Sequence, residues 1–440
     1  MTLGWDHHCA VPDRGSAILD DLAVRGLIQD TTDLDALRAR LDEGPIVLYC
    51  GFDPSADSLH VGNLIGLLVM RRFQLAGHRP IVLAGGATGM IGDPGGRSEE
   101  RNLLDDATLA KNLEGIVPQL RQFLTFGDEP NDARLVDNRS WTVALSAIEF
   151  LRDVGKHVTV NQMLAKEAVK ARIEGESGIS YTEFSYMLLQ ANDFVNLAEL
   201  EGCELQIGGS DQWGNISLGV DLTRRRLGRH VHALTWPLLT RPDGSKYGKS
   251  ASGEQMWLGP HRMSPYRFYQ AWMRSEDSEM RKLLLQLTFL SEAEVDEIIS
   301  RHQQAPEQRL AQRTLSRELT TLVHGPDEAA AAIEASDLLF GGSAGSDITK
   351  RALAALSEEI PTTPVQRQRL VEGIELTELA ADIGLTKSRS EARKLVDQAG
   401  LSVNGEPAAA GVVVGEADLL HGRYVLLRRG KRTFHLVVAR

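Results

Sequence analysis

A polar group of residues at the start of an expected helix could bind an anion. His60 and Asn63 stand three residues apart in the sequence HVGN, which follows the apolar run 46–50 and the turn at Asp53. The first turn of a helix offers unpaired N–H groups and the positive end of the helix dipole, so both side chains could face a phosphate. Gly62 would let that ligand approach the backbone. Taken alone, a histidine in this position is more often a helix cap or a surface residue.

Two lysines stand in a second polar segment much further along the chain. Lys246 and Lys249 lie in PDGSKYGKSASGE, which read alone is a solvated, glycine-rich loop. Together, in this order and with an α/β pattern between them, HVGN and KYGKS resemble the HIGH and KMSKS signatures of class I aminoacyl-tRNA synthetases. Two positions depart from those signatures, because Asn63 replaces the last histidine of HIGH and Gly248 replaces the first serine of KMSKS. An amide never carries charge, and the glycine should loosen the loop.

The wider sequence narrows this resemblance to one family. The segments DPSADSLHVGN, GDPGGRSEER, EFSYMLLQANDF and LQIGGSDQWGN are similar to those of bacterial tyrosyl-tRNA synthetases. The similarity extends from Leu19 to the C-terminus. It implies a two-step reaction in which tyrosine and ATP form tyrosyl-adenylate and pyrophosphate, and the tyrosyl group then moves to the 3′ end of tRNA(Tyr).

One expected helix carries polar side chains on an otherwise apolar surface. Tyr186, Gln190 and Asp193 fall at positions i, i+4 and i+7 of the segment 182–194, and therefore on one helix face. Polar groups on a buried face need partners, because an unpaired buried polar atom costs about 1–3 kcal/mol. They could form a seam bonded to the protein itself or line a pocket for a ligand with an amine and a hydroxyl. The residues alone support both interpretations equally, and the resemblance favours the pocket.

Polar groups also surround the end of a second expected strand. The strand 205–207 runs into two glycines, and Gln206, Asp211 and Gln212 lie around this end. An acidic residue at the carboxyl end of a parallel strand often binds ribose hydroxyls. The glycine-rich segment 85–96 follows another buried strand and suggests backbone close to a ligand, although it matches neither a Walker A loop nor a GxGxxG fingerprint.

The resemblance also assigns roles to individual residues. The catalytic group would consist of His60, Lys246 and Lys249, which would stabilise the β- and γ-phosphates, with Asn63 carried over at lower weight. The tyrosine site would consist of Tyr49, Asp93, Tyr186, Gln190, Asp193 and Gln212. The ATP site would consist of Cys50, Gly51, Asp53, His60, Gly62, Asn63, Gly208, Asp211, Lys246, Lys249 and Ser250.

Within the tyrosine site, the resemblance implies one subsite for each polar group of the amino acid. Tyr49 and Asp193 would bond the phenolic hydroxyl, and such a site rejects phenylalanine because it would leave buried groups unpaired. The ammonium and carboxylate groups would be held, respectively, by Asp93, Tyr186 and Gln190, and by Gln212.

The ATP site implies catalysis by positioning and charge stabilisation. The substrate carboxylate is itself the nucleophile, and no side chain here is placed as a general base. Asp53 would position the α-phosphate through its backbone, and Cys50, Gly208 and Asp211 would contact the ribose. ATP would enter as a substrate accompanied by Mg2+, with no protein metal site evident. Lysines on a glycine-rich loop suit a mobile clamp that closes on ATP.

Three other functions compete with this interpretation. Tryptophanyl-tRNA synthetases share the fold, but Tyr49 with Asp193 and the basic tail favour tyrosine. Nucleotidyltransferases with a related HxGH signature are usually smaller and lack the helical and RNA-binding domains. A non-catalytic RNA-binding paralogue is disfavoured by the intact Lys246 and Lys249 and by the complete pocket face.

The elements that must position these residues alternate between strands and helices. Buried strands are expected at 46–50, 79–84, 134–136 and 205–207, and helices at 16–41, from residue 60, at 105–124, 144–165 and 182–194. This alternation predicts an α/β fold with a Rossmann-like parallel sheet, which binds ligands at the C-terminal ends of its strands.

Composition divides the chain into several regions. After Pro260 the sequence becomes helical, and the glycine-rich stretch 341–346 is typical of a linker. The predicted regions are an N-terminal tail expected to be disordered (1–15), a Rossmann-like catalytic domain with the tyrosine and ATP sites (16–260), an α-helical anticodon-side domain (261–345), a linker (346–372) and a small α+β RNA-binding domain (373–440).

The last region is basic in a chain that is acidic overall. Residues 419–440 contain six Lys/Arg and no Asp/Glu, whereas the whole chain has a net charge of −12. A local basic surface of this kind indicates an RNA phosphate footprint. The pattern resembles the small RNA-binding domain first seen in ribosomal protein S-four. The RNA-binding candidates are Lys387, Arg389, Arg393, Lys394, Arg428, Arg429, Lys431 and Arg432.

Length and composition limit the remaining possibilities. A chain of 440 residues is too long for one compact core. Cys9, Cys50 and Cys203 are widely spaced and cannot all pair, which favours a reducing compartment. No apolar run approaches the ~18 residues of a membrane span, and the N-terminus does not resemble a secretory signal. We therefore expect a cytoplasmic protein without membrane contact, and the resemblance implies a homodimer.

Overall fold

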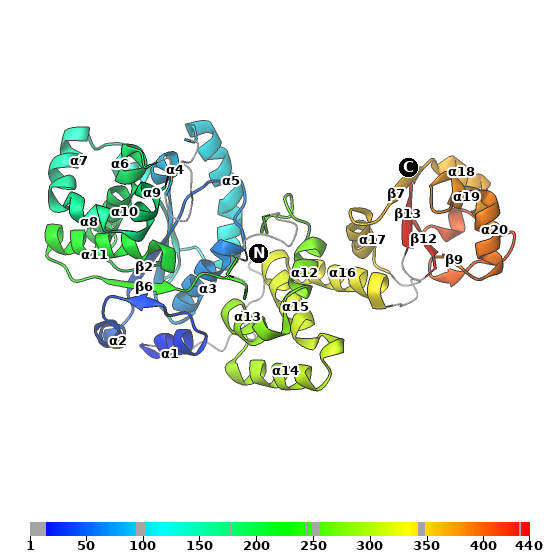
Figure 1. The fold of residues 1–440 in the computed structure, drawn as a ribbon, viewed down its shortest axis with the longest axis horizontal. Coiled ribbons are helices and arrows are strands. Elements are labelled where there is room, and N and C mark those ends of the chain that lie inside the picture. Colours follow the sequence, from blue (N-terminus) through cyan, green and yellow to red (C-terminus); the bar gives the residue numbers. More distant parts are fainter. Residues whose placement is uncertain are drawn as a thin grey trace. The chain divides into compact units, whose positions relative to one another are not determined.

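The structure is a computed structural model that describes residues 15–93, 103–175, 178–242, 244–245, 247, 255–341, 348–430 and 433–440. Its contacts divide the chain into two compact units (Figure 1). Unit 1 comprises Met1–Arg262 and Glu276–Ala311, and unit 2 comprises Met263–Ser275 and Gln312–Arg440. The domain boundaries predicted at residues 260, 345 and 372 remain predictions. Predicted features outside the described residues are the tail up to residue 14, Lys246, Gly248, Lys249, Ser250, Lys431 and Arg432.

Unit 1 is built on a six-stranded sheet with the order β1-β6-β5-β2-β3-β4. Its strands are β1 (Asp30–Thr31), β2 (Val47–Phe52), β3 (Arg79–Ala84), β4 (Arg134–Asp137), β5 (Cys203–Gly209) and β6 (His232–Trp236). The pairs from β6 to β4 are all parallel, which confirms the predicted Rossmann-like arrangement. Only β1 runs antiparallel, at the edge beside β6.

The helices of unit 1 cover both faces of this sheet. Helices α3 and α5 lie on one side and α10 and α11 on the other (Figure 1). In chain order the helices are α1 (Ala17–Val24), α2 (Leu34–Glu43), α3 (Val61–Leu75), α4 (Thr88–Ile91), α5 (Asp106–Phe123), α6 (Arg139–Thr142), α7 (Ala147–Asp153), α8 (Val160–Leu164), α9 (Glu167–Ile173), α10 (Tyr181–Leu200), α11 (Trp213–Leu227), α13 (Met280–Leu287) and α14 (Glu292–Gln304).

The apolar sequence of α3, the helix that follows β2, accounts for its burial. Residues Val61–Leu75 are mostly apolar, and most of α3 is buried. Its polar residues are Asn63, Arg71, Arg72 and Gln74, of which Arg72 is fully buried. A buried guanidinium needs partners that satisfy its charge and its donors, because desolvation is otherwise costly.

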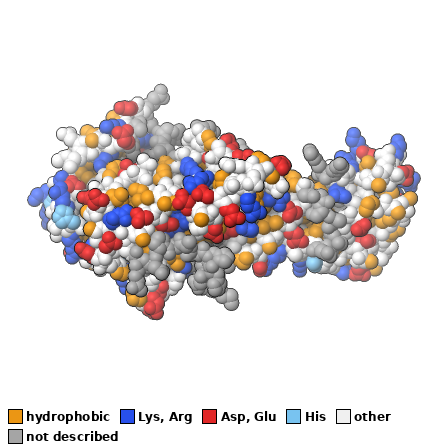
Figure 2. All heavy atoms as spheres, turned by 90° about the horizontal axis from the view of Figure 1, so that it is seen from below, with side chains coloured by type: hydrophobic (Ala, Val, Ile, Leu, Met, Phe, Trp, Pro, Cys, Tyr) orange, Lys and Arg blue, Asp and Glu red, His pale blue; other side chains and the backbone are white. Residues whose placement is uncertain are grey.

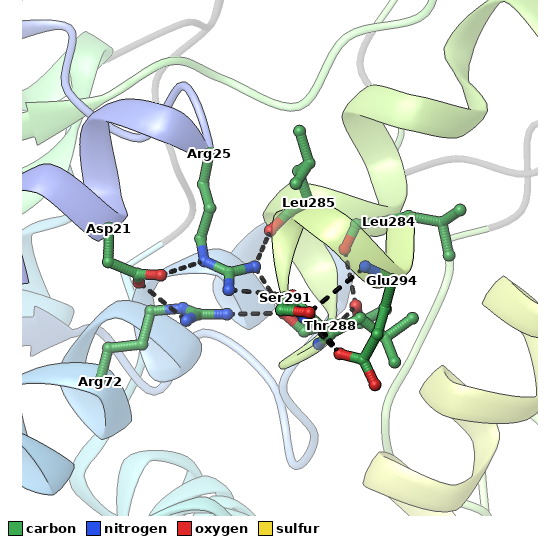
Figure 3. A network of polar contacts seen from close by, with 9 residues as sticks. Asp21, Arg25, Arg72, Leu284, Leu285, Thr288, Ser291 and Glu294 are labelled. Atoms are coloured by element: carbon green, nitrogen blue, oxygen red, sulfur yellow. Dashed lines mark hydrogen bonds and ion pairs between the residues drawn. The ribbon is translucent and has the colours of Figure 1, made fainter. Parts of the chain in front are cut away.

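Those partners come from α1 and from the end of α13 (Figure 3). Arg72 donates to Asp21 at 2.9 Å and to the carbonyl of Thr288 at 2.6 Å. Arg25 donates to the other oxygen of Asp21 at 2.8 Å and to the carbonyl of Leu285 at 2.9 Å. Two guanidinium groups thus neutralise one carboxylate and cap the carbonyl end of α13, where the helix dipole favours positive charge.

Unit 2 contains a five-stranded sheet with the order β10-β9-β12-β13-β7. Its strands, together with the separate pair β8 and β11, are β7 (Thr362–Val365), β8 (Ile374–Glu375), β9 (Leu401–Val403), β10 (Glu406–Pro407), β11 (Val413–Val414), β12 (Tyr424–Arg429) and β13 (Thr433–Ala439). Its helices are α12 (Pro265–Met273), α15 (Leu310–His324), α16 (Pro326–Ser336), α17 (Lys350–Ser357), α18 (Arg367–Glu372), α19 (Leu376–Asp382) and α20 (Arg389–Asp397).

Side chains on the two faces of β12 belong to two different hydrophobic cores. Tyr424 and Leu426 pack with α12, α16 and α17, whereas Val425 and Leu427 pack with α18, α19 and α20. Successive strand residues point to opposite faces, so one strand contributes to both cores. This arrangement confirms the predicted α+β fold at the C-terminal end.

The surface is mixed in charge. Figure 2 shows Lys and Arg side chains interspersed with Asp and Glu on the face turned to the viewer. Within the described ranges, no helix is both long and apolar enough to cross a membrane.

Candidate active site

The site begins where β2 and β5 run side by side. Tyr49 on β2 is in register with Gln206 on β5, and both side chains are buried. Among the described residues, neither the Tyr49 hydroxyl nor the Gln206 Oε1 atom has a hydrogen-bond partner. Leaving such atoms unpaired costs about 1–3 kcal/mol each, so both are suited to a bound polar ligand. Burial, with the nearby Asp193 carboxylate, raises the pKa of Tyr49 well above its usual value, so the phenol stays neutral.

Asp193 is held from two sides on the buried face of α10. Asn138 Nδ2 donates to its Oδ2 atom at 3.0 Å, and Trp141 Nε1 donates to its Oδ1 atom at 2.8 Å. Burial raises the pKa of Asp193 to about 7, while these two hydrogen bonds act in the opposite direction. The result is a rigid acceptor whose charge can change near neutral pH.

A chain of hydrogen bonds links this carboxylate to Asp53 at the end of β2. Asn138 Nδ2 also donates to Thr88 Oγ1 at 3.0 Å, and Thr88 donates to Asp53 Oδ1 at 2.9 Å. The Tyr186 hydroxyl donates to the other oxygen of Asp53 at 2.9 Å. Asp193, predicted to bond the phenolic hydroxyl, and Asp53, predicted for the α-phosphate, therefore belong to one polar network.

A second network joins the residues predicted for the ammonium and carboxylate groups. Gln212 Nε2 donates to Asp93 Oδ2 at 2.6 Å. Asn215 Nδ2 donates to Gln190 Oε1 at 3.0 Å and lies 3.4 Å from Gln212 Oε1. The structure thus brings Asp93, Gln190 and Gln212 together from three separate elements.

The predicted anion site lies at the start of α3. His60 is the N-cap residue of this helix, and its backbone N–H donates to Asn63 Oδ1 at 3.1 Å. A Cβ atom on Gly62 would lie 2.8 Å from the His60 ring, so the imidazole packs directly over this glycine. The glycine leaves room for this ring, and its part in the approach of a ligand stays a prediction. Trp257 packs against the His60 ring in an edge-to-face arrangement with ring centroids 6.3 Å apart.

The residues predicted for the ribose differ in exposure. Cys50 is buried, and burial raises its pKa to about 12, so the thiol is not a nucleophile. Gly208 packs against α11, where a Cβ atom would lie 2.8 Å from Ile216. Asp211 and Gly51 are exposed and therefore accessible to a ligand.

The glycine-rich turn after β3 also has a steric explanation. A Cβ atom on Gly85 would collide with Asp53 and Thr88, and one on Gly86 would lie 2.3 Å from Asp137 Oδ1. These two glycines therefore leave room for the side chains of Asp53, Thr88 and Asp137, and the approach of a ligand to this segment stays a prediction.

Four polar residues of these networks were missed by sequence reasoning, namely Thr88, Asn138, Trp141 and Asn215. Asn138 follows directly after β4 and is fully buried, so its place at a strand end was a usable indication. Nothing local marks Thr88 or Trp141, because their partners lie about 50 residues away in the sequence.

The predicted RNA-binding residues lie in unit 2, mostly on α20 and β12. Arg389 pairs with Glu378 at 3.0 Å, and Arg429 lies 3.7 Å from Glu391. Among the described residues, no ion pair is formed by Lys387, Arg393, Lys394 or Arg428.

Comparisons with known proteins bear on both units. Residues 41–341 match the family described as tRNA synthetases class I (W and Y), and residues 352–437 match a tyrosine–tRNA ligase SYY-like C-terminal domain. The tyrosine–tRNA ligase of Opitutus terrae is 55% identical over 425 residues, covering 96% of this chain and 99% of that protein. That of Thermobifida fusca is 49% identical over 433 residues, with the same coverage.

Solved structures agree with this relationship. A C-terminally truncated mitochondrial tyrosyl-tRNA synthetase from Aspergillus nidulans is 30% identical with a TM-score of 0.66, covering 73% of this chain and 94% of that one. A tryptophanyl-tRNA synthetase from Plasmodium falciparum is 16% identical with a TM-score of 0.53, covering 70% and 84%, and shares the fold alone.

Proposed function

The chain belongs to the class I tRNA synthetases of the tryptophan and tyrosine family, and from this premise we propose the route by which it acts as a tyrosine–tRNA ligase. It activates L-tyrosine with ATP to tyrosyl-adenylate and pyrophosphate, and then transfers tyrosine to tRNA(Tyr). The observation that carries the choice of amino acid is the buried Asp193 carboxylate, fixed by Asn138 and Trp141.

Tyrosine binds between β2, β5 and α10. Its phenolic hydroxyl donates to Asp193 and contacts the Tyr49 hydroxyl, which lacks a partner among the described residues. Its ammonium group is held by Asp93, Tyr186 and Gln190. The Tyr186 hydroxyl, which donates to Asp53, would exchange that partner for the substrate. Gln212 holds the carboxylate.

ATP binds across the C-terminal ends of β2 and β5. Asp53 positions the α-phosphate, and Cys50, Gly208 and Asp211 contact the ribose. His60, Lys246 and Lys249 stabilise the β- and γ-phosphates as the tyrosine carboxylate attacks the α-phosphorus. Mg2+ enters with the triphosphate, because this ion is commonly held by substrate phosphates with few protein ligands. Catalysis is therefore charge stabilisation and alignment, without a protein nucleophile.

The tRNA is bound in part by the basic surface of α20 and β12. Lys387, Arg393, Lys394 and Arg428 support this role because each is free of ion pairs with described residues. Phosphate contacts are salt-dependent, so replacing Lys387 and Arg393 together by alanine should reduce the magnitude of the negative slope of log affinity for tRNA against log salt concentration by about 2. An unchanged slope would remove these residues from the RNA interface.

A second copy of this chain is proposed to cover an apolar surface on α6 to α10. The exposed side chains there are Val143, Ile148, Leu151, Val160, Leu164, Ile173 and Tyr181. Helices α7, α8, α9 and α10 contribute to one hydrophobic core, so the exposed side chains on them have a common support. Exposed apolar groups in such number suit an interface. Ile148→Glu should yield monomers by light scattering, whereas Leu200→Glu, exposed at the other end of α10, should not.

Pyrophosphate exchange tests the activation step directly. Purified protein would be assayed for ATP–pyrophosphate exchange with tyrosine, phenylalanine and tryptophan in parallel. Exchange with tyrosine alone is expected. Exchange with tryptophan would overturn the pocket assignment, and exchange with none would favour an RNA-binding protein without catalysis.

A further inference from the structure

The residue between the two lysines of KYGKS is firmly held in the structure. Tyr247 is only 4% exposed, and its hydroxyl donates to the buried carboxylate of Glu279. Its backbone N–H donates to the carbonyl of Leu239 at 2.9 Å. The guanidinium of Arg241 lies 5.0 Å from the centre of its ring. Burial, a charge-assisted hydrogen bond and a cation–π contact all act on one side chain.

Glu279 lies at the start of a short helix. It is the N-cap residue of α13 and ends the 3-10 helix Asp277–Glu279. The other end of α13 is fixed by Arg25 and Arg72, whose guanidinium groups cap the carbonyls of Leu285 and Thr288 (Figure 3). Because Arg72 lies in the last turn of α3, α13 connects the end of α3 to Tyr247.

The chain after the lysines returns to the beginning of the same helix. The N–H of Val61 donates to the carbonyl of Met256 at 2.9 Å, and the N–H of Leu258 donates to the carbonyl of Leu59 at 2.8 Å. These bonds flank His60. Tyr247 is therefore linked through α13 to the end of α3, and residues 256–258 pair with the start of the same helix.

We propose that Tyr247 and Glu279 are positioning residues for adenylate formation. Their hydrogen bond fixes Tyr247, which is next to Lys246 in the sequence, and its loss would impair the stabilisation of the triphosphate that we assign to His60, Lys246 and Lys249. The inference rests on the proposed function, because it assigns the lysines to that step. Tyrosine binding does not involve this contact, since the tyrosine pocket is built from β2, β5, α10 and the networks around Asp193 and Gln212.

Tyr247→Phe tests the proposal because it keeps the buried ring and removes only the hydroxyl. We expect kcat for tyrosine-dependent pyrophosphate exchange to fall about tenfold, with a higher KM for ATP. The Kd for tyrosine, measured by equilibrium dialysis, should stay unchanged. Glu279→Leu should reproduce this pattern, and Glu279→Gln, which retains an acceptor oxygen, should recover part of the rate. The double variant Tyr247→Phe with Glu279→Leu should be no slower than the slower single variant.

A matched control separates positioning from general destabilisation. Tyr269→Phe removes a hydroxyl from a buried tyrosine of unit 2 and should leave exchange unaltered. Wild-type rates in Tyr247→Phe, or a parallel loss of rate, tyrosine affinity and thermal stability, would overturn the positioning role. Wild-type protein without exchange would instead overturn the proposed function itself.

Discussion

The indole N–H of Trp141 donates to Oδ1 of Asp193 at 2.8 Å, while the second carboxylate oxygen accepts from Asn138. Both donors favour the ionised form of a carboxylate that burial disfavours, and the balance places the pKa of Asp193 at about 7. Charge at this position therefore depends on a few contacts that mutation can remove one at a time.

Tyrosine affinity should depend on pH through Asp193. A phenol donates to the ionised carboxylate, so tyrosine binds that form, and the pKa of about 7 means that most of it is lost below neutrality. Between pH 8 and pH 6 we expect the Kd for tyrosine to rise about tenfold, because the competent fraction falls by that factor. Equilibrium dialysis across this range would measure it. Phenylalanine is the control, since it has no hydroxyl to donate and its weak binding should not deteriorate in acid.

The same shift has a consequence for the free protein. The folded state holds the Asp193 proton more tightly than the unfolded chain, so the stability contributed by this group declines as pH rises from about 4 to about 7. Denaturant titrations without ligand, compared with Asp193→Asn, would isolate this contribution.

Trp141→Phe should move the pH profile of tyrosine binding toward higher pH. The substitution removes a hydrogen bond to the ionised carboxylate and retains an aromatic ring, so the pKa of Asp193 should rise above its present value of about 7. At pH 7 the Kd for tyrosine should increase several-fold, and at sufficiently high pH most of the affinity should return. An equal loss at every pH would mean that Trp141 acts only through packing.

Asp193→Ala should impair selection of the hydroxyl more than catalysis as such. We expect kcat/KM for tyrosine in pyrophosphate exchange to fall at least about 100-fold, because the lost partner is a buried charged acceptor. The rate with phenylalanine should fall much less. If the ratio of the rates with tyrosine and phenylalanine stayed as in the wild type, Asp193 could not be the group that recognises the phenolic hydroxyl.

Gly62→Ala should slow activation without weakening tyrosine binding. The new Cβ atom would lie 2.8 Å from the His60 ring and force it out of position. A displaced imidazole would stabilise the developing charge less well, and a drop of about tenfold to 100-fold in kcat for exchange is expected. Ser55→Ala, at an exposed position in the preceding turn, is a suitable control. Normal kcat in Gly62→Ala would show that the ring position is not critical.

Arg72→Met should destabilise unit 1 substantially. It removes one guanidinium from the Asp21 carboxylate and from the end of α13, and breaking a buried pair typically costs about 3–5 kcal/mol. Urea unfolding would measure the loss. Arg38→Met provides the comparison, because its ion pair with Asp20 is exposed and should contribute no more than about 1 kcal/mol.

Sequence patterns predicted the helices and strands that are determined by residues close together in the chain. The strand expected at 79–84 is β3 with the same bounds, and α14, which begins at a capping box of Ser291 with Glu294, lies in the region predicted to be helical after Pro260. The helix expected at 144–165 was too simple, because Ser146 and Thr159 each cap a new helix within it. The edge strand β1 was missed because two residues form a strand only through pairing with β6.

The site was predictable where a residue follows a strand or shares a helix face. Gln190 and Asp193 were found on one face of α10 in this way. Their partners Asn215 and Trp141 come from other elements, and no spacing rule connects residues that meet only when the sheet has assembled. The same holds for Arg72, whose position in an apolar helix gives no indication of Asp21.

The side-chain oxygen of Asn63 accepts a hydrogen bond from the backbone N–H of His60, and this makes the start of α3 tolerant of acid. A carboxamide presents its acceptor at every physiological pH, whereas an imidazole at the same position would have one acceptor nitrogen when neutral and none when protonated. The hydrogen bond at the start of α3, where His60 lies, is therefore retained in mild acid. Mild acid should thus change the charge of bound phosphate groups without unfolding the start of α3, which orients His60 toward them.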